Sequence, residues 1–150
     1  MSIRKATTED ISVLLQFEQA LIDAERSFDP TLADHTTYYD LPAMMKAENV
    51  LLVVWEEEGK VVASGYVRIE EAKDYVNYSK HGYLGFMYVK PACRGRRIVQ
   101  SVMQHLIDWC KERSIKEFRL EVYRRNNAAI RAYEKLGFEL LKTEMRMQLP

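Results

Sequence analysis

Apolar positions divide the first part of the sequence into strand-like and helical segments. Ile3 to Ala6 is expected to form a short strand, and Thr7-x-x-Asp10 is typical of a helix N-cap. Apolar residues then recur at helical spacing and predict a helix that runs to about residue 24: Ile11, Leu14, Leu15, Leu21 and Ile22. Segment 25–39 is irregular, polar and aromatic, and Pro42 is expected to open a short helix.

Two continuous apolar runs follow at 50–55 and 60–69, and both are rich in β-branched residues. The acidic stretch between them ends in Gly59 and is typical of a solvated turn, so the two runs predict an antiparallel hairpin. A third strand is expected over 83–89.

Strands and helices alternate beyond residue 90. Pro91 ends the third strand, Arg94-Gly95-Arg96-Arg97 forms a basic loop, and the next apolar positions predict an amphipathic helix over 98–113. Alternation then predicts a strand over 118–122, a helix over 126–136 that ends at Gly137, and a terminal strand over 138–149. The second half is therefore βαβαβ-like.

Composition limits the classes of protein that this sequence can represent. With 150 residues, one domain over 1–150 is expected, and no apolar run approaches the roughly 20 residues of a membrane span. The start shows no apolar core typical of a secretory signal, so we expect a cytoplasmic protein. The two cysteines and three histidines do not cluster at ligand spacing, and we expect no bound metal.

The charges balance overall but not locally. Lys plus Arg and Asp plus Glu both number 22, so the formal net charge is 22 − 22 = 0, which is not typical of a nucleic-acid-binding protein. Residues 1–90 carry 9 basic and 15 acidic side chains, net −6, whereas residues 91–150 carry 13 and 7, net +6. This asymmetry points to partners of opposite charge for the two halves.

Two segments of the basic half suggest chemistry. The loop at 94–97 precedes a helix N-terminus, whose unpaired N–H groups attract anions, so it is a candidate phosphate site; alternatively, its arginines are simply solvated. On the next helix, Asn126 and Tyr133 are seven residues apart and share one face. A tyrosine phenol could protonate a leaving thiolate, although a ring packed in the core is the alternative.

The order and spacing of these motifs resemble the GNAT superfamily of acyl-CoA-dependent N-acetyltransferases. The resemblance rests on Val89-x-Pro91-x-x-Arg94-Gly95-x-x-Ile98 together with Asn126-x-x-Ala129-Ile130-x-x-Tyr133-x-Lys135-x-Gly137-Phe138. It implies a three-layer α+β fold with about four helices. Its mixed, mostly antiparallel sheet would have about seven strands, splayed between the fourth (83–89) and fifth (117–123), with acetyl-CoA in the opening.

The resemblance also implies roles for individual residues. The backbone of Met87, Tyr88 and Val89 would hold the pantetheine arm and thioester carbonyl, and Asn126 would contact the cofactor. The pyrophosphate would lie against a loop made of Arg94, Gly95, Arg96, Arg97, Ile98, Val99 and Gln100. Tyr133 would protonate the thiolate. Glu121 would act as general base through water; the alternative is a sheet-surface carboxylate paired with Arg119.

Two departures and the acceptor leave alternatives open. Arg97 and Val99 replace two small residues of the family loop, and their side chains could crowd the phosphates, although Arg97 could also pair with them. Acidic and aromatic residues at 22–39 and 70–81 would suit a cationic amine, or would simply form a solvated surface. We interpret Cys93 as structural and assign no role to His81 or His105. The exposed edge of the terminal strand would also allow a homodimer.

The resulting hypothesis is direct transfer of an acetyl group from acetyl-CoA to a primary amine of a small molecule or peptide. The second hypothesis is a domain that binds acyl-CoA as a sensor or structural ligand without turnover. A partner protein without any CoA site is the third.

Overall fold

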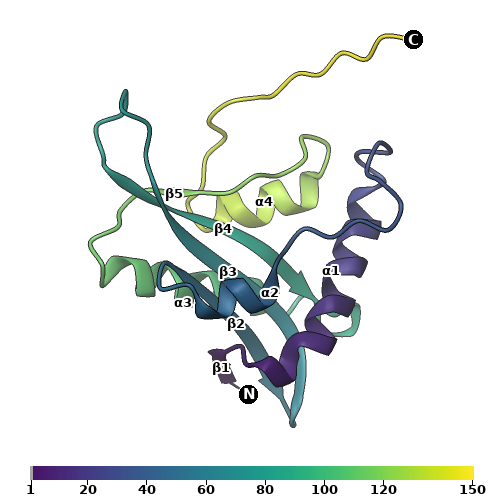
Figure 1. Cartoon of the computed structure of the whole chain (residues 1–150), viewed down its shortest axis with the longest axis vertical. Helices are drawn as coiled ribbons and strands as arrows, with labels where there is room; N and C mark the ends of the chain where they lie inside the picture. Colours follow the sequence, from purple (N-terminus) through teal and green to yellow (C-terminus); the bar gives the residue numbers. More distant parts are fainter. Residues whose placement is uncertain (1) are drawn as a thin grey trace. The chain divides into compact units, whose positions relative to one another are not determined.

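Residues 2–150 are described by a computed structural model, in which one sheet carries the core (Figure 1). The strands are β1 (Ser2–Lys5), β2 (Val50–Glu57), β3 (Lys60–Glu71), β4 (Lys80–Val89) and β5 (Phe118–Arg119). The helices are α1 (Ile11–Glu25), α2 (Leu41–Lys46), α3 (Ile98–Lys111) and α4 (Asn127–Lys135), with short 3-10 turns η1 (Thr8–Asp10) and η2 (Pro91–Cys93). The predicted first helix, hairpin and amphipathic third helix are confirmed.

The sheet has the order β1-β2-β3-β4-β5, with antiparallel neighbours except for the parallel pair β4 and β5. Helices α1 and α2 cover one face, where Leu14, Phe17, Leu41 and Met44 pack on Tyr66 and Phe86. Helix α3 covers the other face and buries Val102, Met103, Leu106 and Cys110 completely or nearly so. Within residues 2–120 the sheet therefore lies between two helical layers.

Gly65 allows the third helix to approach the sheet closely. A Cβ built on Gly65 would lie 2.7 Å from Cγ1 of Val102 and 2.8 Å from Sδ of Met87, closer than real Cβ atoms come. Because glycine has no Cβ, it allows α3 to pack this closely on β3.

A β-bulge interrupts the pairing of β3 with β4. Ser64 is opposite Tyr88 and Tyr66 is opposite Gly85, so Phe86 and Met87 together face the single residue Gly65. Phe86 has a φ of 53°, in the left-handed region, and its carbonyl accepts a hydrogen bond from Ser64 Oγ at 2.9 Å. A buried phenylalanine in this conformation is a strained residue, and such bulges re-aim the strand next to functional sites.

Strands β4 and β5 pair over a short length only, and the expected splay between them stays a prediction. Strand β5 pairs with β4 only at Gly82 and Tyr83, opposite Phe118 and Arg119. Beyond that point the outer edge of β4 has no neighbouring strand within residues 2–120.

The expectation of about seven strands is wrong for the described residues, which form five. The fifth strand is two residues long rather than 118–122, and residues 138–150 form no strand. Alternating apolar residues make a strand only where a neighbouring strand and an apolar face receive them, whereas Met145, Met147 and Leu149 are all at least 80% exposed. Pairing of two chains through this segment stays a prediction.

The chain divides into two compact units, Met1–Leu120 and Glu121–Pro150. The second unit contains α4, which ends at Gly137 with a φ of 104°, a left-handed C-terminal cap of the predicted kind. Among residues 2–150, no helix has the length and hydrophobicity of a membrane span.

Candidate active site

The bulge brings three predicted residues of β4 to the open edge of the sheet. Met87 and Tyr88 are half-buried, and Val89 is buried. The Val89 carbonyl is already used, because it accepts a hydrogen bond from Arg94 Nε at 3.0 Å. The Arg94 guanidinium also lies 5.8 Å from the centre of the Tyr88 ring. Arg94 thus joins the end of β4 to the loop that follows, a structural role that spacing alone could not reveal.

The basic loop turns sharply to start α3. Gly95 has a φ of 81° and Arg97, the residue before the helix, a φ of 62°. Left-handed residues just before the start of a helix direct several backbone N–H groups toward one point. The N–H groups of residues 95–100 donate no hydrogen bond to any described residue, and the first turn of α3 carries no acidic side chain. This arrangement can bind a pyrophosphate.

The three arginines of this loop are in different states. Arg96 forms an ion pair with Glu57 at the end of β2, and this partner lowers the pKa of the Glu57 carboxyl. Arg97 is exposed and forms no ion pair within residues 2–150. Ile98 is 3% exposed, so only its backbone can face a ligand. Among the loop arginines, Arg94 and Arg97 are therefore the cations without an ion pair in the described residues, and Val99 and Gln100 are half-buried.

The second unit holds the other predicted site residues. Asn126 is the N-cap of α4, and its Oδ1 accepts the Ala129 N–H at 3.3 Å. Its amide Nδ2 remains for a ligand. Tyr133 is half-buried and packs edge-on against Phe138, with ring centroids 6.2 Å apart. Glu121 is exposed and lies outside β5, so its expected place on a strand is wrong, because the strand ends at Arg119.

The expected pairing of Arg119 is also different. Arg119 Nε donates to Glu117 at 2.8 Å, and an Nη group bonds the Tyr78 hydroxyl. The partners of Arg119 are therefore Glu117, just before β5, and Tyr78, in the segment before β4.

A buried carboxylate that the sequence did not single out organises the acceptor-side loop. Glu18 is 0% exposed, and its Oε2 accepts the N–H groups of Tyr38 and Tyr39 at 2.9 and 2.8 Å. The signal was available: position 18 is one helical turn from both Leu14 and Ile22, on the buried face of α1. An acidic residue on that face needs a partner, which the loop backbone supplies.

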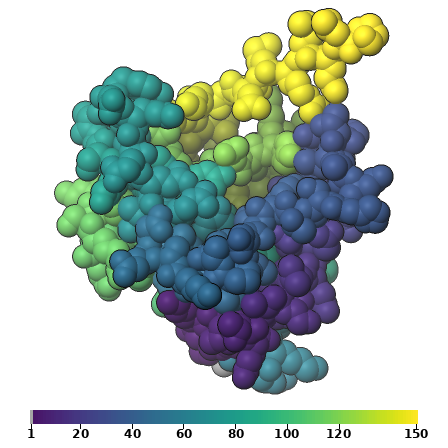
Figure 2. Space-filling model, in the orientation of Figure 1, coloured from purple at the N-terminus to yellow at the C-terminus, as the bar shows by residue number. Residues whose placement is uncertain are grey.

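Tyr39 connects this loop to the bulge. Its ring stacks on Phe86 with centroids 4.6 Å apart and lies 5.7 Å from the Tyr66 ring. Burial, together with the nearby tyrosines and carboxylates, raises the pKa of the Tyr39 hydroxyl above its usual range, so the phenol is neutral. Figure 2 shows the segment that contains it, in blue, across the face between α1 and the β3–β4 hairpin.

Several acidic residues expected to line the acceptor side serve the fold instead. Asp23 pairs with Arg26, Asp29 accepts from Thr31, and Asp40 caps α2 through the Ala43 N–H. Glu25 differs, since burial raises the pKa of its carboxyl. Among the described residues, no group of three or more His, Cys, Asp or Glu side chains is placed to hold a metal ion.

A family model described as "Acetyltransferase (GNAT) family" matches residues 16–138, which include β4, the basic loop and α4. The chain belongs to this GNAT acetyltransferase family. The mixed α+β fold implied by the sequence resemblance is thereby confirmed.

Known proteins agree with this GNAT assignment. The peptidyl-lysine N-acetyltransferase YiaC of Escherichia coli (strain K12) is 32% identical over 88 residues, which are 59% of this chain and 49% of that protein. The chain thus spans about half the length of this curated relative. An acetyltransferase of Clostridium acetobutylicum, described as predicted and solved with acetyl-CoA, has a TM-score of 0.77 at 20% identity, covering 98% of this chain and 95% of the other.

The aminoglycoside N-acetyltransferase AAC(6')-Iy, solved in complex with CoA, has a TM-score of 0.76 at 14% identity, covering 99% of both chains. GNAT structures similar to this chain therefore bind acetyl-CoA or CoA, and one of them acts on aminoglycosides. At these identities the similarity concerns the fold, and the acceptor of this GNAT chain is a separate question.

Proposed function

We propose that this protein transfers an acetyl group from acetyl-CoA directly to a primary amine of a small molecule or peptide. The observation that carries the proposal is the opened edge of β4 at the Phe86 bulge, followed at once by the unbonded N–H groups of residues 95–100. An open strand edge can bind an extended pantetheine arm, and a helix N-terminus can bind its pyrophosphate.

Backbone groups would do most of the cofactor binding. Met87 and Tyr88 would hold the pantetheine amides and thioester carbonyl, because the Val89 carbonyl is bonded to Arg94. Arg97 would add a charge-assisted contact to the pyrophosphate, whereas Arg96 is paired with Glu57. Asn126 Nδ2 would donate to the cofactor while Oδ1 keeps its helix cap.

The transfer itself needs a neutral amine, a polarised carbonyl and a proton for the thiolate. The amine nitrogen would attack the thioester carbon, so that the C–N bond forms and the C–S bond breaks. Tyr133 would give its phenolic proton to the departing sulfur, and Glu121 would receive the amine proton through water. Burial of Tyr133 against Phe138 limits the motion of the phenol and supports this role.

A second candidate is acyl-CoA binding without turnover. The specific observation in its favour is Arg97, a bulky residue with a φ of 62° at a position where the family loop has a small residue. If the Arg97 side chain crowds the phosphates, CoA would sit displaced from the bulge.

Release of the CoA thiol from acetyl-CoA, measured against a panel of primary amines, tests the proposal. Tyr133→Phe should lower kcat by about 100-fold, since general acids typically contribute at least that much. Tyr75→Phe is the matched control, because Tyr75 is 80% exposed in the loop before β4 and should not change the rate. An unchanged rate in Tyr133→Phe removes the acid role, and CoA binding with no turnover on any amine supports the second candidate.

A further inference from the structure

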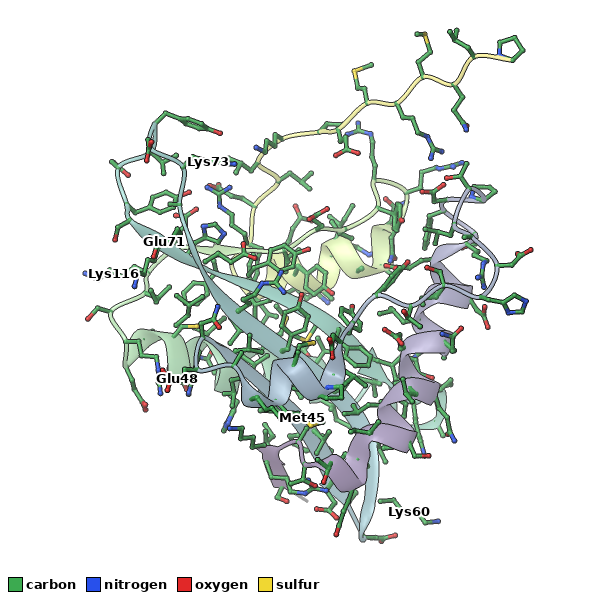
Figure 3. All side chains as sticks on the ribbon, viewed as in Figure 1. Met45, Glu48, Lys60, Glu71, Lys73 and Lys116 are labelled. Atoms are coloured by element: carbon green, nitrogen blue, oxygen red, sulfur yellow. The ribbon has the colours of Figure 1, made fainter. Side chains whose placement is uncertain are left out.

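A groove on the α1 and α2 face of the sheet has no assigned ligand. It has a volume of about 280 Å³, and its walls include Tyr38, Tyr39, Asp40, Met44, Asn49 and Arg68. Figure 3 labels Met45 on α2, the helix that forms one side of it. The space suits part of a small ligand, since pockets for whole drug-sized ligands start at about 300 Å³.

Arg68 is held rigidly in the wall of this groove. Its Nε donates to Glu70 Oε2 at 2.7 Å, and its guanidinium carbon lies 5.6 Å from the centres of both the Tyr66 and Tyr83 rings. The other oxygen of Glu70 is 3.1 Å from His81 Nε2, so the carboxylate is shared. Both Nη groups of Arg68 have no partner among the described residues, and the side chain is 39% exposed. A fixed guanidinium fork of this kind recognises a carboxylate through two parallel bonds.

Asp40 supplies the opposite charge in the same groove. Its Oδ1 accepts the Ala43 N–H at 3.2 Å as the cap of α2, and its Oδ2 accepts no hydrogen bond from residues 2–150. A ligand that enters the groove therefore meets a cation and an anion, as a zwitterion would require.

The groove adjoins the bulge through one aromatic ring. Tyr39 lines the groove and stacks on Phe86, with centroids 4.6 Å apart. Arg68 is opposite Tyr83 in the sheet register, and Tyr83 is three residues before Phe86 on β4, about 10 Å at 3.3 Å per residue. An acceptor with its head group in the groove needs an extended chain of several carbons to bring an amine to the bulge.

We propose that this groove binds the α-amino acid head group of the acceptor, with the carboxylate on the Nη groups of Arg68 and the α-ammonium on Asp40. The acetylated group is then a distal primary amine, as in lysine or ornithine, and it attacks the thioester carbon as described above. This inference rests on the proposed acetyltransferase function and names its acceptor class.

Four acceptors separate the two contacts. L-lysine carries both head-group charges, lysinamide lacks the carboxylate, Nα-acetyl-lysine lacks the α-ammonium, and Nα-acetyl-lysinamide lacks both. The wild-type protein should use L-lysine with a kcat/KM about tenfold or more above that of each blocked form, the expected value of one charge-assisted contact. A preference for Nα-acetyl-lysinamide, the mimic of a lysine within a peptide, overturns the proposal.

Each contact has its own variant. Arg68→Gln should abolish the preference of L-lysine over lysinamide. Asp40→Asn should abolish the preference over Nα-acetyl-lysine, and it retains an oxygen for the cap of α2, since asparagine caps helices as well as aspartate does. A preference that survives in either variant overturns the assignment of that contact.

Arg119→Gln is the matched control. Arg119 also donates through Nε to a glutamate two residues away and lies over a tyrosine ring, 5.7 Å from Tyr78, but it does not line the groove. This variant should keep every preference of the wild type. Loss of these preferences in Arg119→Gln would show that the effect of Arg68→Gln is general damage to the sheet surface.

Calorimetry separates this inference from the proposed function. If L-lysine binds the wild-type protein, but not Arg68→Gln, and no acceptor releases thiol, the head-group site stands and the transferase function fails. If amines other than these are acetylated and L-lysine neither binds nor reacts, the function stands and the head-group site is overturned.

Discussion

Glu18 Oε2 accepts the backbone N–H of Tyr39 at 2.8 Å, although 21 residues of sequence separate the two. Because the same oxygen also accepts the Tyr38 N–H, one buried carboxylate holds the loop that carries Tyr39 onto Phe86. Glu18→Ala should lower the free energy of unfolding by about 2 kcal/mol, since it leaves two partly buried N–H groups without their acceptor. Urea unfolding measures this.

Glu18→Gln is the control for that prediction. Its amide oxygen can still accept both N–H groups, so the loss should be about 1 kcal/mol. Equal losses in the two variants would mean that the charge of Glu18, and not its hydrogen bonds, holds the loop.

Affinity for CoA should distinguish two neighbouring arginines. Arg97→Gln removes an unpaired cation at the start of α3 and should weaken CoA binding about 5- to 10-fold, with a shallower salt dependence. Arg96→Gln removes a charge already paired with Glu57 and should change the affinity less than about threefold. Calorimetry at two salt concentrations measures both. Stronger CoA binding in Arg97→Gln would show that this side chain blocks the phosphates.

The two functions of Asn126 can be separated by substitution. Asn126→Ala removes the cap of α4 and should cost about 1 kcal/mol of stability together with CoA affinity. Asn126→Asp keeps a capping oxygen but replaces the Nδ2 donor with a carboxylate, so stability should persist while CoA binding falls. CoA affinity that follows only the helix stability would limit Asn126 to the cap.

Acid should weaken the N-terminal part of the fold through Asp10. This 5%-exposed carboxylate accepts bonds from Arg4 at 2.8 Å and from the Thr7 N–H at 2.8 Å, and the Arg4 guanidinium lowers its pKa. A pKa that is lower in the folded state gives stability above the unfolded pKa of about 3.9, and this stability disappears as the pH falls through the folded value. Asp10→Asn should therefore be less stable than wild type at pH 7, and the difference should shrink below about pH 4.

Thermal unfolding between pH 2 and pH 7 measures this effect. A difference between the two proteins that is constant over this range would exclude the carboxylate as its source.

The spacing of apolar residues predicted the helices, because a short stretch of sequence is enough to define each of them. The apolar spacing of residues 11–24 and 98–113 marked α1 and α3 to within two residues, and the cap at Thr7 and Asp10 is present. The loop at 94–97 was correctly placed before a helix start. What the pattern could not show is which side chains already have partners: Arg96 pairs with Glu57, 39 residues away, and Arg94 donates to the Val89 carbonyl.

One feature that was not predicted and one wrong prediction have a common cause. Phe86 carries no glycine-like signal for a left-handed bulge, and residues 138–149 alternate like a strand without forming one. In both cases the conformation depends on whether a neighbouring strand is present and in which register, and neither is encoded in a local window. Glu18 and Arg68 were missed for a related reason, since their partners lie in other elements.

The packing at Gly65 also constrains how this protein can change over evolutionary time. Because a Cβ at this position would collide with both Val102 and Met87, a relative with a larger residue there needs a smaller or displaced side chain at each of the other two positions. Positions 65, 87 and 102 should thus vary together among descendants of a common ancestor. Since Met87 is one of the two bulge residues, a mutation at position 102 of α3 would be transmitted to the strand edge where the thioester is proposed to lie.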